Sequence, residues 1–249
     1  MIADKSDIHS LSADSARRRF GGVARRYDLL NRLISLGQDR RWRRLAVSRL
    51  APRSGERVLD LGAGTGDLAL EAVRQFPGVR VIAADLTPEM VRLGRRKPGA
   101  QSVRWVIAEA GNLPFAQGAF DGTISGFLLR NVESLDGALA EQLRVLRPDG
   151  GWVALDTTPA CPSLFRPLIE LHFRLVIPLL GRLVAGRVQA YRWLTASTRG
   201  FLAAEELAER LAKAGFESVG FRRLMLGAIA VHWAARSPHP AAPPAPAGS

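Results

Sequence analysis

Short apolar runs of strand length alternate along the chain with amphipathic stretches of helical length. Two amphipathic stretches come first, and we predict helices there, at 27–34 and 39–50. Strands are then expected at 57–61, 79–85, 103–107, 120–125 and 152–156, separated by helices at 67–75, from 88 onward and at 135–146. This alternation is typical of a mostly parallel sheet with helices on both faces.

Local signals mark where several of these elements begin and end. Thr87 is a suitable N-cap, Pro88 fits the first helical position, and Glu89 places a negative charge in the first turn. The run Pro-Asp-Gly-Gly at 148–151 predicts a break between a helix and the next strand. These signals fix the starts and stops that hydrophobic periodicity leaves vague.

The C-terminal part predicts one more helix and a hairpin. A helix is expected at 203–214, ending at Gly215, and strands at 217–223 and 228–235 are joined by a short turn with Gly227. The last strand should therefore run antiparallel to the rest of the sheet. We predict a disordered N-terminus at 1–15, one domain over 16–236 that carries an inserted helical cap at about 160–200, and a disordered Pro/Ala-rich tail at 237–249.

Composition indicates the cellular compartment of the protein. The chain has 249 residues, of which 47% are hydrophobic, enough for a sizeable core, and its single cysteine, Cys161, cannot form an internal disulfide. No signal peptide is visible, and no apolar stretch reaches the about 18–20 residues of a transmembrane helix. These features favour a reduced, cytoplasmic location.

The formal net charge of +12 points to an anionic partner. Aromatic residues make up only 7% of the chain, and nothing resembles an RNA-reading module. We therefore expect no nucleic-acid partner and favour transient contact with an anionic membrane surface, at the inner face of the cell membrane. An arginine-rich composition without a binding role is the alternative.

The residues that indicate chemistry lie after the first expected strand. The stretch Val-Leu-Asp-Leu-Gly-Ala-Gly-Thr-Gly-Asp at 58–67 reads as a strand, a glycine turn and the start of a helix. Asp85 ends the next strand, about twenty residues on, where such units grip a ribose hydroxyl pair. The pattern predicts a nucleoside-cofactor site, and a glycine turn without a ligand is the alternative.

Two common cofactor classes do not match this loop. A dinucleotide fingerprint needs its last glycine where this chain has Asp67, because Gly66 comes one residue early. A phosphate-binding P-loop needs the sequence GK[ST], which is absent. A dinucleotide reductase is therefore disfavoured. The order D-x-G-x-G-x-G instead resembles the first motif of Rossmann-like S-adenosylmethionine (SAM) methyltransferases.

Other motifs resemble one family of these enzymes, the ubiquinone/menaquinone biosynthesis C-methyltransferases (UbiE/MenG type). They are F-x-x-V-A-x-x-Y-D-x-x-N at 20–31, S-x-G-x-x-R-x-W at 35–42, L-R-N-V at 129–132 and Y-x-W-L-x-x-S at 191–197. The opening and L-R-N-V motifs are specific, and the others are more generic. The resemblance covers about residues 17–236.

The resemblance implies a class I methyltransferase fold, with seven strands and an antiparallel last strand, and SAM as the cofactor. It implies C-methylation of a polyprenylated quinol, most simply demethylmenaquinol to menaquinol. The cofactor-binding residues that it implies are Tyr27, Asp60, Gly62, Gly64, Thr65, Gly66, Asp85, Leu86, Glu109, Ala110 and Ser125.

On the substrate side, Arg130, Asn131 and Tyr191 are the candidate catalytic residues. A ring carbon is a poor nucleophile toward a sulfonium methyl unless a neighbouring hydroxyl has lost its proton, so Arg130 could stabilise the quinolate and Asn131 could bind a ring oxygen. The alternatives are a surface arginine and a helix cap. His172 and His232 are expected to be buried structural residues, and no metal site is expected, because no cluster has metal-ligand spacing.

Three segments depart from the family pattern. The departures are five residues: Asp156, Thr157 and Thr158 stand where the family often has Glu-Phe-Ser, Glu109 replaces an asparagine or aspartate, and Leu128 replaces a glycine. These changes bear on the substrate more than on SAM.

The apolar, arginine-interleaved segment 164–184 offers shelter for an isoprenoid tail or contact with a bilayer. It fits a homodimer surface or a helix packed on the sheet equally well. Two other functions stay open for the protein: a methyltransferase for another hydrophobic phenol or lipid, and a non-catalytic lipid-binding protein of this fold.

Overall fold

The structure is a computed structural model, which describes residues 13–159 and 200–238. Its seven strands form one sheet in the order β3-β2-β1-β4-β5-β7-β6. Strand β7 is antiparallel to both of its neighbours, and the other six strands run in one direction, as expected from the sequence. The strands are β1 (Arg57–Leu61), β2 (Arg80–Asp85), β3 (Val103–Ile107), β4 (Phe120–Gly126), β5 (Leu146–Thr157), β6 (Phe216–Leu224) and β7 (Ile229–Arg236).

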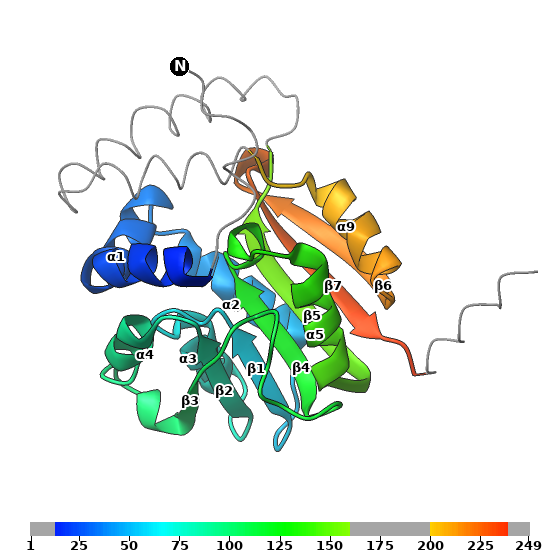
Figure 1. Cartoon of the computed structure of the whole chain (residues 1–249), viewed down its shortest axis with the longest axis horizontal. Helices are drawn as coiled ribbons and strands as arrows, with labels where there is room; N and C mark the ends of the chain where they lie inside the picture. The colour runs from blue at the N-terminus through cyan, green and yellow to red at the C-terminus, as the bar shows by residue number, and fades with distance from the viewer. Residues whose placement is uncertain (1–12, 160–199, 239–249) are drawn as a thin grey trace, which may run out of the picture.

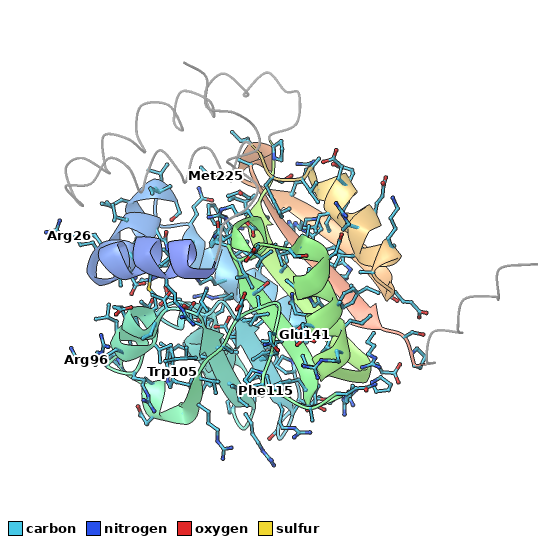
Figure 2. The ribbon with its side chains drawn as sticks, in the orientation of Figure 1. Arg26, Arg96, Trp105, Phe115, Glu141 and Met225 are labelled. Carbon is cyan, nitrogen blue, oxygen red and sulfur yellow. The ribbon has the colours of Figure 1, made fainter. Side chains whose placement is uncertain are left out.

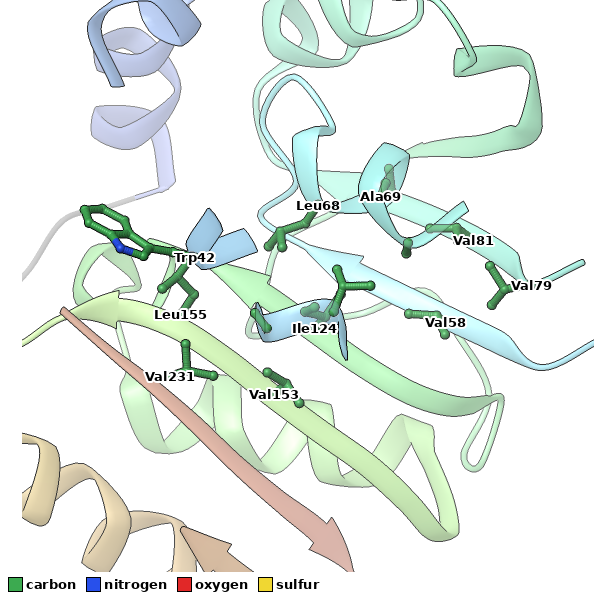
Figure 3. Packing of buried hydrophobic residues seen from close by; sticks show 14 of the residues in the cluster. Trp42, Val58, Leu68, Ala69, Val79, Val81, Ile124, Val153, Leu155 and Val231 are labelled. Atoms are coloured by element: carbon green, nitrogen blue, oxygen red, sulfur yellow. The ribbon is translucent and has the colours of Figure 1, made fainter. Parts of the chain in front are cut away.

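Helices cover both faces of this sheet (Figure 1). On one face, α2 (Asp39–Leu50) packs on Val153 and Leu155 of β5, and α3 (Asp67–Gln75) packs on β2, β3 and β4 within the same cluster of buried residues (Figure 3). On the other face, α5 (Leu135–Val145) and α9 (Ala204–Lys213) pack on Trp152 and Ala154. Alternate residues of β5 thus face opposite layers, as the two-residue period of a strand requires.

Two further helices lie beside the carboxyl edge of the sheet. Helix α1 (Ala13–Ile34) packs on α4 (Pro88–Gly94), which follows β2. Short 3-10 turns complete the described elements: η2 (Ala100–Ser102), η3 (Leu129–Asn131) and η6 (Met225–Gly227).

Two elements differ from the sequence expectation because of tertiary packing. Helix α1 begins at Ala13 rather than at 27, and it continues through Gly21, whose backbone lies against Glu89 of α4. Strand β5 includes the expected break at 148–151, where its pairing with β4 shifts register and Asp149 has a φ of 60°. The run Pro-Asp-Gly-Gly therefore makes a bulge within the paired region rather than a loop before it.

Several other expectations concern residues that the structure leaves undescribed. The two helical stretches expected after 160 lie within 160–199, and most of the two chain ends lies in 1–12 and 239–249. The division into domain, cap and tails stays a prediction. In the part of the chain that is described, none of the helices combines the length and the apolar character needed to cross a bilayer.

Candidate cofactor and substrate site

A cavity of about 400 Å³ opens at the carboxyl edge of the sheet, beside the point where the strand order reverses around β1. Ligands of open α/β sheets bind at such a point, and the volume is in the range of small-molecule sites, about 300–1,000 Å³. Loops after β1, β2, β3 and β4 form its walls, and α1 covers it. The lining includes Phe20, Tyr27, Gly62, Gly64, Asp85, Leu86, Thr87, Met90, Glu109, Ala110, Asn112, Phe127, Leu128 and Asn131.

Asp85 joins two of these loops at the cavity wall. One carboxylate oxygen accepts a hydrogen bond from the Gly64 backbone N–H at 2.7 Å, and the other accepts from the Thr87 backbone N–H at 2.8 Å. Burial raises the pKa of Asp85, and these two bonds oppose the rise. Each oxygen keeps a further lone pair, so the carboxylate is able to accept hydroxyl donors of a ligand.

The glycines of the loop after β1 serve different purposes. Gly62 and Gly64 line the cavity with positive φ angles of 66° and 57°. A Cβ atom on Gly62 would lie 2.6 Å from Cδ1 of Leu128, so a side chain there would collide with Leu128, which also lines the cavity. Gly66 lies outside the lining and packs against the Trp105 ring (labelled in Figure 2). Its place in the motif reflects helix–strand packing rather than contact with the cavity.

Asp60 is fully buried beneath the same loop. One oxygen accepts from the Ala69 N–H at 2.9 Å, and the other has no hydrogen-bond partner. Asp60 lines a small hollow of about 30 Å³ with Thr65 and other loop residues. An unpartnered buried carboxylate oxygen fits an ammonium group such as that of the methionine part of SAM.

The ionisation of Asp60 should make stability depend on pH. Burial raises the pKa of Asp60 from 3.8 to about 7, while its bond from Ala69 opposes the rise. The folded protein then holds this proton to a higher pH than the unfolded chain does. The free energy of unfolding should therefore fall as pH rises from about 4 to about 7, by at most about 4 kcal/mol.

Denaturant unfolding of the wild type and of an Asp60→Asn variant, measured from pH 4 to pH 8, checks this expectation. The wild type should lose stability across this window relative to the variant, because asparagine carries no titrating proton. A stability difference between the two proteins that does not change with pH would contradict the shifted pKa.

A charged cluster attaches α1 to the glycine loop. The Thr65 hydroxyl lies 2.6 Å from a carboxylate oxygen of Asp28, which follows Tyr27 on α1. The Lys97 ammonium contacts Thr65 at 2.8 Å and both Asp28 and Asp67 at 2.6 Å. Tyr27 is thereby held over the cavity, where burial raises its pKa. Thr65 takes part in this attachment and lines the small hollow, but it does not line the larger cavity.

The loop after β3 forms the outer rim of the cavity. Glu109 and Ala110 both line it, and Glu109 is exposed. Leu86 lies on the neighbouring wall after β2. These three residues occupy the places expected for the adenine end of a nucleoside cofactor, although their role stays a prediction.

Arg130 lies behind the cavity rather than in its lining. Its side chain is 5% exposed and forms an ion pair with Asp156 of β5, which is 2% exposed. Its guanidinium carbon lies 5.2 Å from the centre of the Phe127 ring, and its Nε has no hydrogen-bond partner. The surface-arginine alternative is therefore wrong.

Asn131 does reach the cavity. Its amide NH₂ donates to the Phe127 carbonyl oxygen at 2.7 Å, and its buried Oδ1 has no partner. It lies in η3, and α5 is capped instead by Ser134, whose hydroxyl accepts from the Gly137 N–H at 3.1 Å. The cap alternative for Asn131 is thus wrong, and its side chain keeps a buried acceptor without a partner at the cavity wall.

The remaining candidates lie elsewhere. Ser125 is buried in β4, with no hydrogen-bond partner for its hydroxyl, and it lines neither hollow. Tyr191 and His172 lie outside the described residues. His232 is buried as expected, with Nε2 2.9 Å from the Ala204 carbonyl oxygen and a pKa lowered by burial.

Several cavity residues were not expected to contact a ligand. Phe20, which opens the motif at 20–31, lies on α1, and Met90 lies on α4 without a chemical pattern of its own. Phe127 has a φ of 58°, rare for a bulky residue, and that backbone conformation brings its N–H 2.7 Å from the Leu155 carbonyl oxygen. Sequence patterns indicate such a conformation for glycine and not for phenylalanine.

Comparison with known proteins gives the family. A model of the ubiE/COQ5 methyltransferase family matches residues 9–236. The chain belongs to this family. The family and enzyme class expected from the motifs are thereby confirmed: the protein is a methyltransferase.

Relatives match almost the whole chain. A demethylmenaquinone methyltransferase of Thermus thermophilus is 43% identical over 215 residues, which cover 86% of this chain and 97% of that protein. A ubiquinone/menaquinone biosynthesis C-methyltransferase UbiE of Desulfotalea psychrophila is 40% identical over 216 residues, 87% of this chain and 88% of that protein. A demethylmenaquinone methyltransferase of Deinococcus radiodurans is 38% identical, covering 93% and 95%.

Solved structures confirm the fold. The [4+2]-cyclase SpnF has a TM-score of 0.68 at 17% identity, covering 92% of this chain and 97% of that chain. A SAM-dependent methyltransferase from Thermotoga maritima has a TM-score of 0.62 at 20% identity, covering 89% and 100%. The class I methyltransferase fold expected from the sequence is confirmed.

Proposed function

We propose that this enzyme methylates a ring carbon of a polyprenylated quinol with SAM, converting demethylmenaquinol to menaquinol, the last step of menaquinone biosynthesis. The observation that carries the proposal is the 43% identity to the demethylmenaquinone methyltransferase of Thermus thermophilus over 97% of its length. The UbiE relative, whose name includes ubiquinone, makes a ubiquinone-type quinol the second candidate.

The residues around the cavity suit SAM. Asp85 offers its carboxylate to the ribose hydroxyls, and Glu109 at the rim is an acceptor for the adenine amino group. The unpartnered oxygen of Asp60 suits the ammonium of the methionine end. Gly62 and Gly64 line the wall between them. SAM, when bound, supplies an electrophilic methyl group.

The substrate side supports loss of the quinol proton. The unpartnered Oδ1 of Asn131 is an acceptor for a ring hydroxyl at the cavity wall. The positive charge of Arg130 lies just behind it and favours the quinolate, whose electron density makes the ring carbon nucleophilic. The buried ion pair with Asp156 fixes the position of that charge. Tyr191 is proposed to face the substrate from the segment after β5.

We propose that the enzyme works in the cytoplasm and meets its lipophilic substrate at the inner face of the cell membrane. A polyprenyl chain partitions into a bilayer because each buried CH₂ contributes about 0.8 kcal/mol. The net charge of +12 is suited to anionic lipids.

Methyl transfer from labelled SAM to reduced demethylmenaquinone by the purified protein tests the proposed reaction. A reduced ubiquinone precursor and a simple naphthol without a prenyl chain serve as parallel substrates. We expect label in menaquinone at the highest rate. SAM binding with no label in any quinol would contradict the proposal and favour a different phenol or a non-catalytic role.

A further inference from the structure

Exposed leucines gather where α1 ends, before α2. Leu36 is 68% exposed, and Leu29 and Leu33 precede it at helical spacing with 52% and 36% of their surface exposed. Leu36 also has a left-handed backbone, with a φ of 53°, a conformation that branched side chains rarely adopt. The fold thus holds a large apolar side chain in solvent on a strained backbone, and packing within the described chain does not account for it.

Another exposed leucine with a left-handed backbone lies at the turn between β6 and β7. Met225 and Leu226 have φ angles of 47° and 53°, and Leu226 is 52% exposed. This turn and the start of α2 border one hollow of about 710 Å³, which is lined by Gly37 and Met225 among others. Leu36 and Leu226 adjoin those two lining residues in sequence. The two exposed leucines therefore flank the same hollow.

This hollow lies at the carboxyl edge of the sheet, as the cofactor cavity does. Strand β6 runs parallel to β5, so the turn after it lies at that edge (Met225 is labelled in Figure 2). Helix α2 starts there too, since Trp42 near its start packs by Leu155, whereas Leu50 at its end meets Gly122 at the start of β4.

The walls of the hollow are strongly basic. Arg40, Arg41 and Arg222 line it, and among the described residues none of the three has an acidic partner. The acidic residue of this part of α2, Asp39, is buried and paired with Arg43. Unpaired arginines beside exposed leucines are the combination that binds headgroups and inserts into the acyl boundary of a bilayer.

We propose that this leucine–arginine face, defined as Leu29, Leu33, Leu36, Leu226, Arg40, Arg41 and Arg222, docks on an anionic phospholipid bilayer. The inference rests on the proposed function, because a polyprenylated quinol resides in a bilayer. RNA is a poorer fit, since bases stack on exposed aromatic rings and the aromatic residue of this hollow, Trp42, is buried. Docking at this edge brings the lipid to the side of the molecule where the cofactor cavity opens.

Co-sedimentation of the intact protein with vesicles tests the arginines. The vesicles are phosphatidylcholine alone or phosphatidylcholine mixed with phosphatidylglycerol. The double variant Arg40→Gln/Arg41→Gln should bind mixed vesicles about 25-fold more weakly, at about fivefold for each arginine. The matched control Arg95→Gln/Arg96→Gln makes the same charge change at exposed positions after α4, away from the face (Arg96 in Figure 2). It should lose less than about threefold.

Leucine variants test the apolar part without harming the fold. Asparagine adopts the left-handed backbone readily, so Leu36→Asn/Leu226→Asn should keep or raise the thermal midpoint while vesicle binding falls about tenfold or more. A drop in the thermal midpoint with vesicle binding unchanged would mean that the leucines serve the fold, and it would overturn the proposal.

Other outcomes separate this proposal from the enzymatic one. With quinol embedded in mixed vesicles, the Arg40→Gln/Arg41→Gln variant should be slow, and with a short-tailed quinol in solution it should match the wild type. Equal binding to neutral and mixed vesicles, tighter binding to RNA, or a dimer that the variants dissociate would each overturn docking on anionic lipid. Methyl transfer to the short-tailed quinol in solution is independent of all these results, so failure of the docking proposal and failure of the proposed function are distinguishable.

Discussion

An Asp85→Asn variant should bind SAM about 100-fold or more weakly than the wild type. The carboxylate accepts from the N–H groups of Gly64 and Thr87 and keeps lone pairs for two ligand hydroxyls. Hydrogen bonds to a charged group contribute about 1.5–3 kcal/mol each, and neutral ones about 0.5–1.5 kcal/mol. Asparagine removes one acceptor and leaves the other uncharged, and the two losses together give a factor of about that size. Asparagine also turns an NH₂ donor toward one of the two backbone donors, which weakens the junction of the β1 and β2 loops.

Isothermal titration of SAM into both proteins measures the effect. Glu109→Gln is the matched control, because it makes the same carboxylate-to-amide change at an exposed position of the same cavity. We expect that control to lose less than about tenfold, since an exposed amide still accepts a hydrogen bond. Equal affinities for the Asp85 variant and the wild type would show that the ribose is held elsewhere.

The sequence predicted the elements that carry strong local signals. The bounds of α2, β1, α3 and β3 agree with the expectation residue for residue, because glycine turns and abrupt changes of periodicity mark them. It failed at the start of α1 and within β5. Those two depend on contacts with α4 and β4, which lie far away in sequence, and tertiary contacts override local preference there.

The candidate site likewise contains residues that the sequence predicted and contacts that it did not. Gly62, Gly64, Asp85 and Glu109 come together at the cavity because the carboxyl ends of neighbouring parallel strands meet at one edge. The contact of Lys97 with Asp28 and Thr65 had no signal, because it joins three segments whose relative positions only the fold determines. Motif spacing therefore identifies functional side chains that follow strands. It misses the hydrogen bonds and ion pairs that join elements far apart in sequence.

A contact of this kind, the ion pair between Arg130 and Asp156, changes how the L-R-N-V motif is interpreted. The spacing placed Arg130 at the ligand edge, and the structure adds a buried partner, Asp156, at a position where this chain departs from the family's usual glutamate. A charge held in a pair behind the cavity acts on a ligand through the electric field more than through direct contact. That arrangement gives Arg130 both a structural and a proposed chemical role, which a single substitution does not separate.

Removing Arg130 alone should damage both the fold and the reaction. An Arg130→Ala variant leaves Asp156 as an uncompensated buried charge, so we expect the free energy of unfolding to fall by about 3–5 kcal/mol. Methyl transfer per folded molecule should fall about 10²–10³-fold, the usual loss when one group that stabilises an oxyanion is removed. Denaturant unfolding and single-turnover methyl transfer at saturating SAM measure the two effects.

The double variant Arg130→Met/Asp156→Leu separates those two roles. Replacing both members of a buried ion pair by apolar residues of similar size is often neutral for stability, so most of the lost stability should return. SAM affinity should stay within about threefold of the wild type, because neither side chain lines the cofactor cavity. The loss of methyl transfer should nevertheless persist, since no positive charge remains behind Asn131. Recovery of both stability and turnover in the double variant would mean that the pair only supports the fold, and the quinolate would then need another source of positive charge.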